Sequence, residues 1–91
     1  MNIVARHIIF GGRVQGVGFR YTARDIARQR GIKGYVRNLS DGTVEMFAQG
    51  LPAAIDDCIA DIRGSFGPYV RDVQIDDATA DERYRDFIIT F

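Results

Sequence analysis

The chain has 91 residues, and its twelve basic and twelve acidic side chains give a formal net charge of zero. This length is typical of a single domain, and a balanced charge gives the molecule as a whole no attraction for nucleic acid or anionic membranes. One cysteine and one histidine, Cys58 and His7, are too few for an internal disulfide or a Cys/His zinc set. We therefore expect one domain over residues 1–91 that needs no metal or other cofactor.

Residues 1–10 lack the apolar run of a signal peptide, and no later stretch is long enough to span a bilayer, so we expect a cytoplasmic protein. The charge is unevenly distributed along the chain. Residues 1–38 hold eight basic side chains and one acidic, whereas residues 39–91 hold four basic and eleven acidic. Either one part of the surface favours a small anion, or the two halves interleave in the fold and their charges pair on a solvated surface.

The first half of the chain predicts a strand, a loop and a helix. Residues 4–14 include a run of β-branched and aromatic side chains that is typical of a buried strand. A tight loop is expected over residues 15–20, where Gly16 and Gly18 permit backbone angles that other residues rarely adopt. Residues 21–30 then place apolar side chains at helical spacing and stop at a glycine, which predicts a helix.

A hairpin and a second helix follow. Strand-like runs at residues 34–38 and 43–48 flank residues 39–42, whose Asp-Gly pair is a strong turn signal. From Pro52 onward, apolar side chains recur at i, i+3, i+4 and i+7, which predicts a helix that ends just before Gly64.

After a loop over residues 64–68, residues 70–75 predict a fourth strand and residues 87–91 a short fifth strand. Right-handed crossovers then place both helices on one face of a mixed, mainly antiparallel sheet. The fold class is α+β: a ferredoxin-like βαββαβ sandwich with a short C-terminal edge strand. Because this architecture hosts RNA binders, metal carriers, ligand sensors and enzymes, the site must decide the function.

Few side chains qualify for acid–base or nucleophilic chemistry. Cys58 lies on the apolar face of the second predicted helix, where a packed core thiol is expected. His7 lies inside the first strand, and a structural or surface role is favoured over that of a general base. The neighbouring carboxylates at 56–57 and at 76–77 point in different directions and are expected on the solvated surface.

The loop at 15–20 is more informative. It resembles part of a dinucleotide-binding fingerprint, but Tyr21 stands where the third glycine belongs, and no Gly-Lys-Ser/Thr completes a nucleotide P-loop. A glycine loop before a helix can bind phosphate through its N–H groups, and Arg20 adds a planar fork of donors. The predicted phosphate-binding residues are Gln15, Gly16, Val17, Gly18, Phe19 and Arg20. The alternative, equally compatible with the loop alone, is a glycine-rich turn beside an exposed arginine.

Two longer motifs carry a family resemblance. Residues 12–20, GRVQGVGFR, and residues 34–38, GYVRN, with residues 41–45, DGTVE, resemble the signatures of the acylphosphatase family. The resemblance continues through residues 49–50 and, more loosely, through 67–68 and 87–89. It therefore covers nearly the whole chain, and nine contiguous matching residues are far more specific than a glycine pattern.

The resemblance implies a ferredoxin-like fold, metal-free hydrolysis of acyl phosphates, and catalysis by Arg20 and Asn38. Arg20 would hold the phosphate, Asn38 would orient the attacking water, and a phosphate oxygen of the substrate would accept the proton. The leaving group is a carboxylate, which is a weak base and needs no protonating acid. From the residues alone, however, a turn-capping role for Asn38 is favoured.

The expected partners are a small acyl phosphate as substrate and inorganic phosphate as product and competitive inhibitor, with no nucleic acid, no membrane and a monomeric chain. One alternative is a non-catalytic module that binds phosphate or acyl phosphate on the same fold. RNA binding would need exposed aromatic side chains such as Phe10 and Phe47, and the zero net charge argues against it. A similar domain occurs within larger hydrogenase-maturation proteins, whose other parts 91 residues cannot contain.

Overall fold

The computed structural model describes residues 2–91. The elements follow the predicted order of strand, helix, two strands, helix and strand, with a short strand at the end. They are β1 (Val4–Gly12), α1 (Phe19–Gln29), β2 (Lys33–Asn38), β3 (Val44–Gly50), α2 (Pro52–Phe66), the 3-10 turn η1 (Gly67–Tyr69), β4 (Val70–Ala78) and β5 (Phe87–Ile89).

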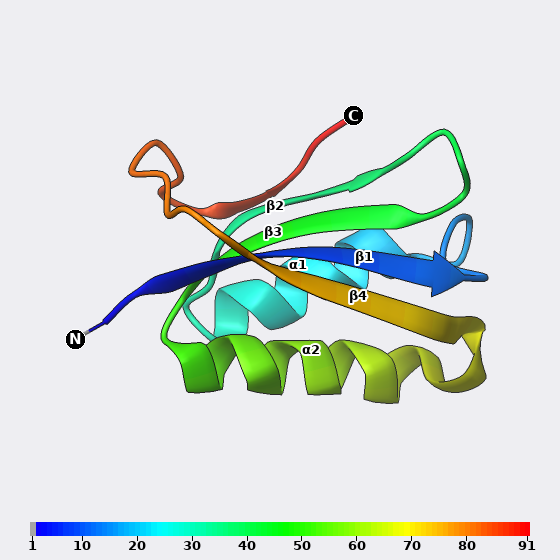
Figure 1. Cartoon of the computed structure of the whole chain (residues 1–91). Helices are drawn as coiled ribbons and strands as arrows, with labels where there is room; N and C mark the ends of the chain where they lie inside the picture. Colours follow the sequence, from blue (N-terminus) through cyan, green and yellow to red (C-terminus); the bar gives the residue numbers. More distant parts are fainter. Residues whose placement is uncertain (1) are drawn as a thin grey trace.

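The five strands form one sheet in the order β4-β1-β3-β2-β5. β1 pairs antiparallel with both β3 and β4, and β2 pairs antiparallel with β3. Among the pairings of residues 2–91, only that of β5 with β2 is parallel. Both helices lie against one face of the sheet (Figure 1). The predicted ferredoxin-like α+β fold, including the short C-terminal edge strand, is confirmed.

The core lies between this face of the sheet and the two helices. Alternate side chains of β1, Ile8 and Phe10, are fully buried there, as the period of a strand requires. α2 contributes the four predicted positions Ile55, Cys58, Ile59 and Ile62. Burying an aliphatic or aromatic side chain of this size stabilises the fold by about 1.5–3 kcal/mol. The Phe19 ring, 2% exposed, lies 5.0 Å from the Phe10 ring centroid and fixes the first turn of α1 against the sheet.

The structure corrects two predicted helix boundaries. α1 begins at Phe19, two residues earlier than expected, so Arg20 lies in the first helical turn rather than in the loop. α2 continues through Gly64 to Phe66 and ends at Gly67, whose φ is 52°. An interior glycine costs a helix about 1 kcal/mol relative to alanine. The helix continues through Gly64 nonetheless, because the ring of Phe66 then packs against that of Phe19, with the two ring centroids 4.7 Å apart.

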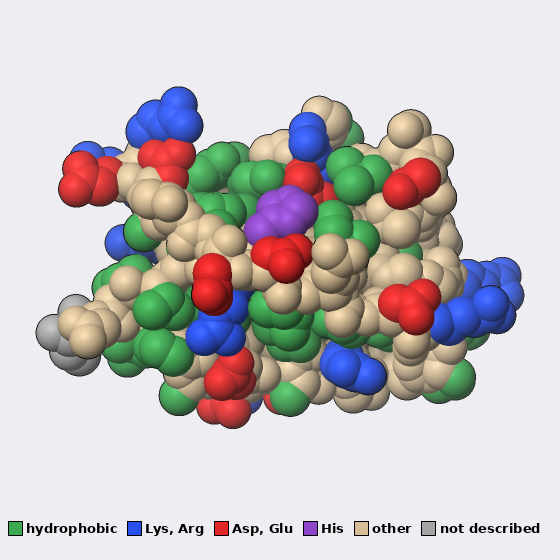
Figure 2. Space-filling view, viewed as in Figure 1, with side chains coloured by type: hydrophobic (Ala, Val, Ile, Leu, Met, Phe, Trp, Pro, Cys, Tyr) green, Lys and Arg blue, Asp and Glu red, His purple; other side chains and the backbone are tan. Residues whose placement is uncertain are grey.

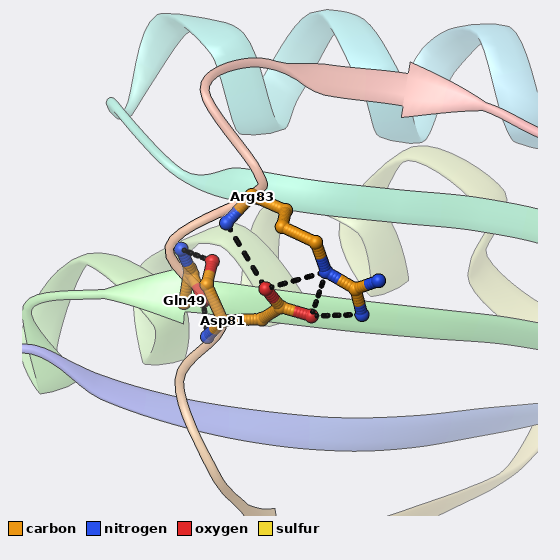
Figure 3. A network of polar contacts seen from close by, with 3 residues as sticks. All are labelled: Gln49, Asp81 and Arg83. Atoms are coloured by element: carbon orange, nitrogen blue, oxygen red, sulfur yellow. Dashed lines mark hydrogen bonds and ion pairs between the residues drawn. The ribbon is translucent and has the colours of Figure 1, made fainter.

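The last third of the chain also differs in detail. β4 extends to Ala78, three residues beyond the predicted end, because its pairing with β1 continues to Ala5. The segment between β4 and β5 is held to β3 by Gln49, whose amide donates to the Asp81 carbonyl at 3.0 Å and accepts from the Asp81 N–H at 2.8 Å. The Asp81 carboxylate in turn accepts from Arg83 (Figure 3). This connection lies at the end of β3 far from the β2–β3 turn.

Candidate active site

The connection between β1 and α1 has the backbone conformation that its glycines allow. Gly16 and Gly18 have φ values of 76° and 78°, in the left-handed region that other residues rarely adopt. A Cβ at either position would meet no atom within 4 Å, so glycine is required here by the backbone conformation and not by lack of space.

The N–H groups of this loop have no acceptor within residues 2–91. Gly18 is the N-cap of α1, and no side chain caps the helix there. Within residues 2–91, the first helical N–H bond runs from Thr22 to the Gly18 carbonyl, and the N–H groups of residues 16–20 donate to no other atom. Unpaired donors at a helix N-terminus, together with the helix dipole, favour an anion.

Arg20 lies beside these donors, in the first turn of α1. Its side chain is half-buried, and the guanidinium carbon lies 5.4 Å from the centroid of the Phe91 ring. No carboxylate of the described chain forms an ion pair with it. The guanidinium donors are therefore available to an oxyanion.

Other basic side chains of the first half of the chain form ion pairs with acidic side chains of the second half. Four basic residues of the first half pair with carboxylates of the second: Arg6 with Asp56, Arg28 with Asp86, Arg30 with Asp61, and Arg37 with Glu45. The interpretation of interleaved, pairing halves is thus correct for these residues, and Figure 2 shows such mixed charges on one face. Within residues 2–91, Arg13 and Arg20 at the loop end form no ion pair; Lys33 also forms none, but it pairs with Gln49 at the opposite end of the sheet.

Asn38 is the last residue of β2 and pairs with Val44 of β3. Its side-chain oxygen Oδ1 is buried and has no hydrogen-bond partner among residues 2–91. A buried polar atom without a partner costs about 1–3 kcal/mol, and such an atom in a folded protein calls for a reason. Because Oδ1 is closed to solvent in this conformation, a donor from water or a ligand can reach it only after the Asn38 side chain turns.

The turn after Asn38 is capped by a different residue. The Asp41 carboxylate accepts from the Thr43 N–H at 3.0 Å and from the Thr43 hydroxyl at 2.6 Å, and these bonds hold the pKa of Asp41 below its ordinary value. The turn-capping role considered for Asn38 from the residues alone is therefore filled by Asp41.

The side chain of Gln15, the first residue of the predicted phosphate-binding loop, bonds to the β2–β3 turn. Its amide nitrogen Nε2 donates to the carbonyl oxygens of Leu39 and Thr43, both at 2.8 Å, and so connects the loop to the β2–β3 turn. The segments that carry Arg20 and Asn38 are thereby held at the same end of the sheet (Figure 1). Sequence reasoning missed this contact, because its partners are 24 and 28 positions away.

Cys58 and His7, the other two side chains considered for chemistry, lie away from the loop and Asn38. Cys58 is fully buried, as predicted, and burial raises the pKa of its thiol to about 12. His7 contacts Glu45 at 2.7 Å across the sheet face that the helices leave open, where Figure 2 shows the single histidine beside acidic side chains. Burial alone would raise the pKa of Glu45, but hydrogen bonds with His7 and Arg37 outweigh it and hold that pKa below its ordinary value. These contacts favour the structural role for His7.

The two aromatic side chains required for RNA binding are not available on the surface. Phe10 is completely buried in the core. Phe47 is 9% exposed and packs between Tyr35 and Tyr84, with ring centroids 5.9 and 5.4 Å away. Neither ring can stack on a base without rearrangement.

Neither a metal-binding cluster nor a membrane-spanning helix is found within residues 2–91. No three side chains of the His, Cys, Asp and Glu types gather closely enough to hold a metal ion. No helix over that range is long and apolar enough to cross a membrane.

Comparison with known proteins identifies the family. The acylphosphatase family model matches residues 6–89. An acylphosphatase of Ligilactobacillus salivarius is 45% identical over 85 residues, 92% of this chain and 94% of the relative. An acylphosphatase of Archaeoglobus fulgidus is 40% identical over 92 residues, 98% of this chain and 100% of the relative. The crystal structure of acylphosphatase from Bacillus subtilis matches with a TM-score of 0.89 at 34% identity, over 97% of this chain and 99% of that one. The chain belongs to the acylphosphatase family.

Proposed function

We propose that this chain is an acylphosphatase that hydrolyses the carboxyl–phosphate bond of acyl phosphates to a carboxylate and inorganic phosphate. The observation that carries the proposal is a set of polar groups without partners at one end of the sheet. These groups are the N–H donors of residues 16–20, the guanidinium of Arg20 and the buried oxygen of Asn38. Because the chain belongs to the acylphosphatase family, we infer that this arrangement binds and hydrolyses an acyl phosphate.

The phosphate is bound by the loop and by Arg20. Successive N–H groups in a glycine loop form a concave site for an oxyanion, and the N-terminus of α1 adds its positive dipole end. Arg20 can donate two parallel hydrogen bonds to phosphate oxygens, a geometry that lysine cannot reproduce. These donors also neutralise the charge that would otherwise repel the attacking water.

Asn38 positions that water. A turn of the side chain brings its partnerless Oδ1 toward the site, where it accepts a hydrogen bond from the water and leaves an oxygen lone pair directed at phosphorus. An amide is not a base at neutral pH, so the water proton passes to a phosphate oxygen of the substrate. The new oxygen–phosphorus bond forms as the bond to the carboxylate oxygen breaks, and that oxygen leaves with the electron pair. Because the carboxylate is a weak base, no side chain needs to protonate it.

The alternative is a module that binds phosphate or acyl phosphate without turnover. An assay with benzoyl phosphate, followed by its loss of ultraviolet absorbance and by phosphate release, separates the two. We expect turnover that persists in excess chelator and competitive inhibition by inorganic phosphate. Binding of benzoyl phosphate without release of phosphate would establish the module instead, and activity that chelator abolishes and Mg²⁺ restores would contradict the metal-free mechanism.

A further inference from the structure

The side chain of Gln15 makes the hydrogen bonds that join the loop to the hairpin. It is half-buried, and its Nε2 carries two hydrogens, one for each of the carbonyl oxygens of Leu39 and Thr43. The loop is held independently at its two ends. At the start, the Arg13 N–H donates to the Tyr69 carbonyl at 2.8 Å, and at the end Phe19 is buried in the core.

The two carbonyl groups that Gln15 contacts lie next to Asn38. Leu39 follows Asn38 directly, and Thr43 precedes Val44, the residue that faces Asn38 on β3. Leu39 and Thr43 also bond to each other, because the Leu39 N–H donates to the Thr43 carbonyl at 2.9 Å. Gln15 therefore holds the residue pair immediately beyond Asn38 at a fixed distance from the loop.

We propose that Gln15 is a positioning residue, which sets the distance and direction from the loop-bound phosphate to the water held by Asn38. The inference rests on the proposed function and adds a residue to it. Phosphate binding depends on α1 and on loop N–H groups whose ends are held without Gln15. Attack in line with the leaving oxygen depends in addition on where Asn38 stands relative to that phosphate. A misplacement of about 1 Å between reacting groups can lower a rate about 100-fold.

Removal of the hydrogen-bond donors of Gln15 should therefore lower turnover more than substrate binding. Gln15→Met keeps the length and approximate volume of the side chain and removes both hydrogen bonds without adding charge. We expect kcat to fall at least tenfold, whereas KM for benzoyl phosphate and the inhibition constant of inorganic phosphate change little. If Gln15→Met does not fold, Gln15→Asn keeps the amide but is one methylene too short to reach both carbonyl groups, and the same pattern is expected.

The chain offers a matched control in Gln49. Gln49 is more buried than Gln15, and it too makes two hydrogen bonds that hold a connecting segment to the sheet, but at the opposite end of β3. Gln49→Met should lower the unfolding midpoint about as much as Gln15→Met and leave kcat per folded molecule close to that of the wild type. Equal losses of kcat in both variants would mean that the effect is general destabilisation.

A double-mutant cycle with Asn38→Ala then tests whether Gln15 acts through Asn38. If it does, Gln15→Met costs little further activity once Asn38 is absent. The same fold-loss in both backgrounds, or a phosphate inhibition constant that rises as much as kcat falls, would overturn the positioning role. Wild-type protein without turnover would overturn the proposed function and this role together, whereas active wild type with an equally active Gln15→Met would overturn the role of Gln15 alone.

Discussion

Asn38→Ala separates catalysis from stability more cleanly than any other single change in this protein. The Oδ1 atom that the substitution removes is buried and accepts no hydrogen bond within residues 2–91, so the fold loses no bond to that atom. Removing a buried acceptor without a partner relieves a penalty of about 1–3 kcal/mol, which the lost packing of the side chain partly offsets. We therefore expect a free energy of unfolding equal to or slightly above that of the wild type.

The expected effect on the reaction is much larger. If Asn38 holds the attacking water, kcat should fall by about 10²–10³, the loss typical of removing one preorganised polar group, which corresponds to about 2.7–4 kcal/mol of transition-state stabilisation. Binding should survive, because the loop and Arg20 hold the phosphate without Asn38. Steady-state kinetics with benzoyl phosphate, inhibition by inorganic phosphate and urea unfolding on one preparation measure all three quantities.

Asp41→Ala is the control for a purely structural effect on the same turn. The Asp41 carboxylate makes two hydrogen bonds to Thr43, so its loss should lower the unfolding midpoint and leave kcat per folded molecule within a few-fold of the wild type. The water-positioning role of Asn38 would be refuted if Asn38→Ala behaved like Asp41→Ala, with reduced stability and nearly unchanged turnover.

Two further changes test other parts of the molecule. Arg20→Lys keeps the charge but loses the planar fork of donors. The loss of charge-assisted hydrogen bonds is worth about 1.5–3 kcal/mol, which predicts a fall of about 10- to 100-fold in kcat/KM. Inhibition by inorganic phosphate should weaken as well. Kinetics close to those of the wild type would remove Arg20 from the site. Glu45→Gln should lower stability at neutral pH, because hydrogen bonds with His7 and Arg37 hold the pKa of Glu45 below its ordinary value. Because the pKa of Glu45 is lower in the folded chain than in the unfolded chain, its ionised form stabilises the fold above the unfolded-state pKa of about 4.3. This contribution is lost as the pH falls further. The difference in free energy of unfolding between the variant and the wild type should therefore shrink below about pH 4. A constant difference between pH 7 and pH 3 in unfolding experiments would contradict this origin of the stability.

The sequence predicted the elements and their arrangement because the signals for them are local. Helical spacing from Pro52 placed Cys58 on the buried face of α2, and the Asp-Gly pair predicted the turn between β2 and β3. Local signals were less reliable at the helix ends. Gly64 is typical of a helix terminus, but α2 passes through it, because Phe66 gains a contact with Phe19 that is 47 positions away in the sequence.

Part of the candidate site could likewise be predicted from the sequence, and part required the folded structure. Arg20, Asn38 and the loop at 15–20 could be named from the sequence, because motifs of a few residues carried them. The side-chain contacts around them required the folded chain: the Gln15 amide bonds to the turn, Asp41 caps that turn, and Asn38 Oδ1 has no partner within residues 2–91. Such partners are fixed by strand register and by the packing of α1 on the sheet. The Gln15 contacts span 24 and 28 positions of the chain, a separation that local patterns of residue type do not encode.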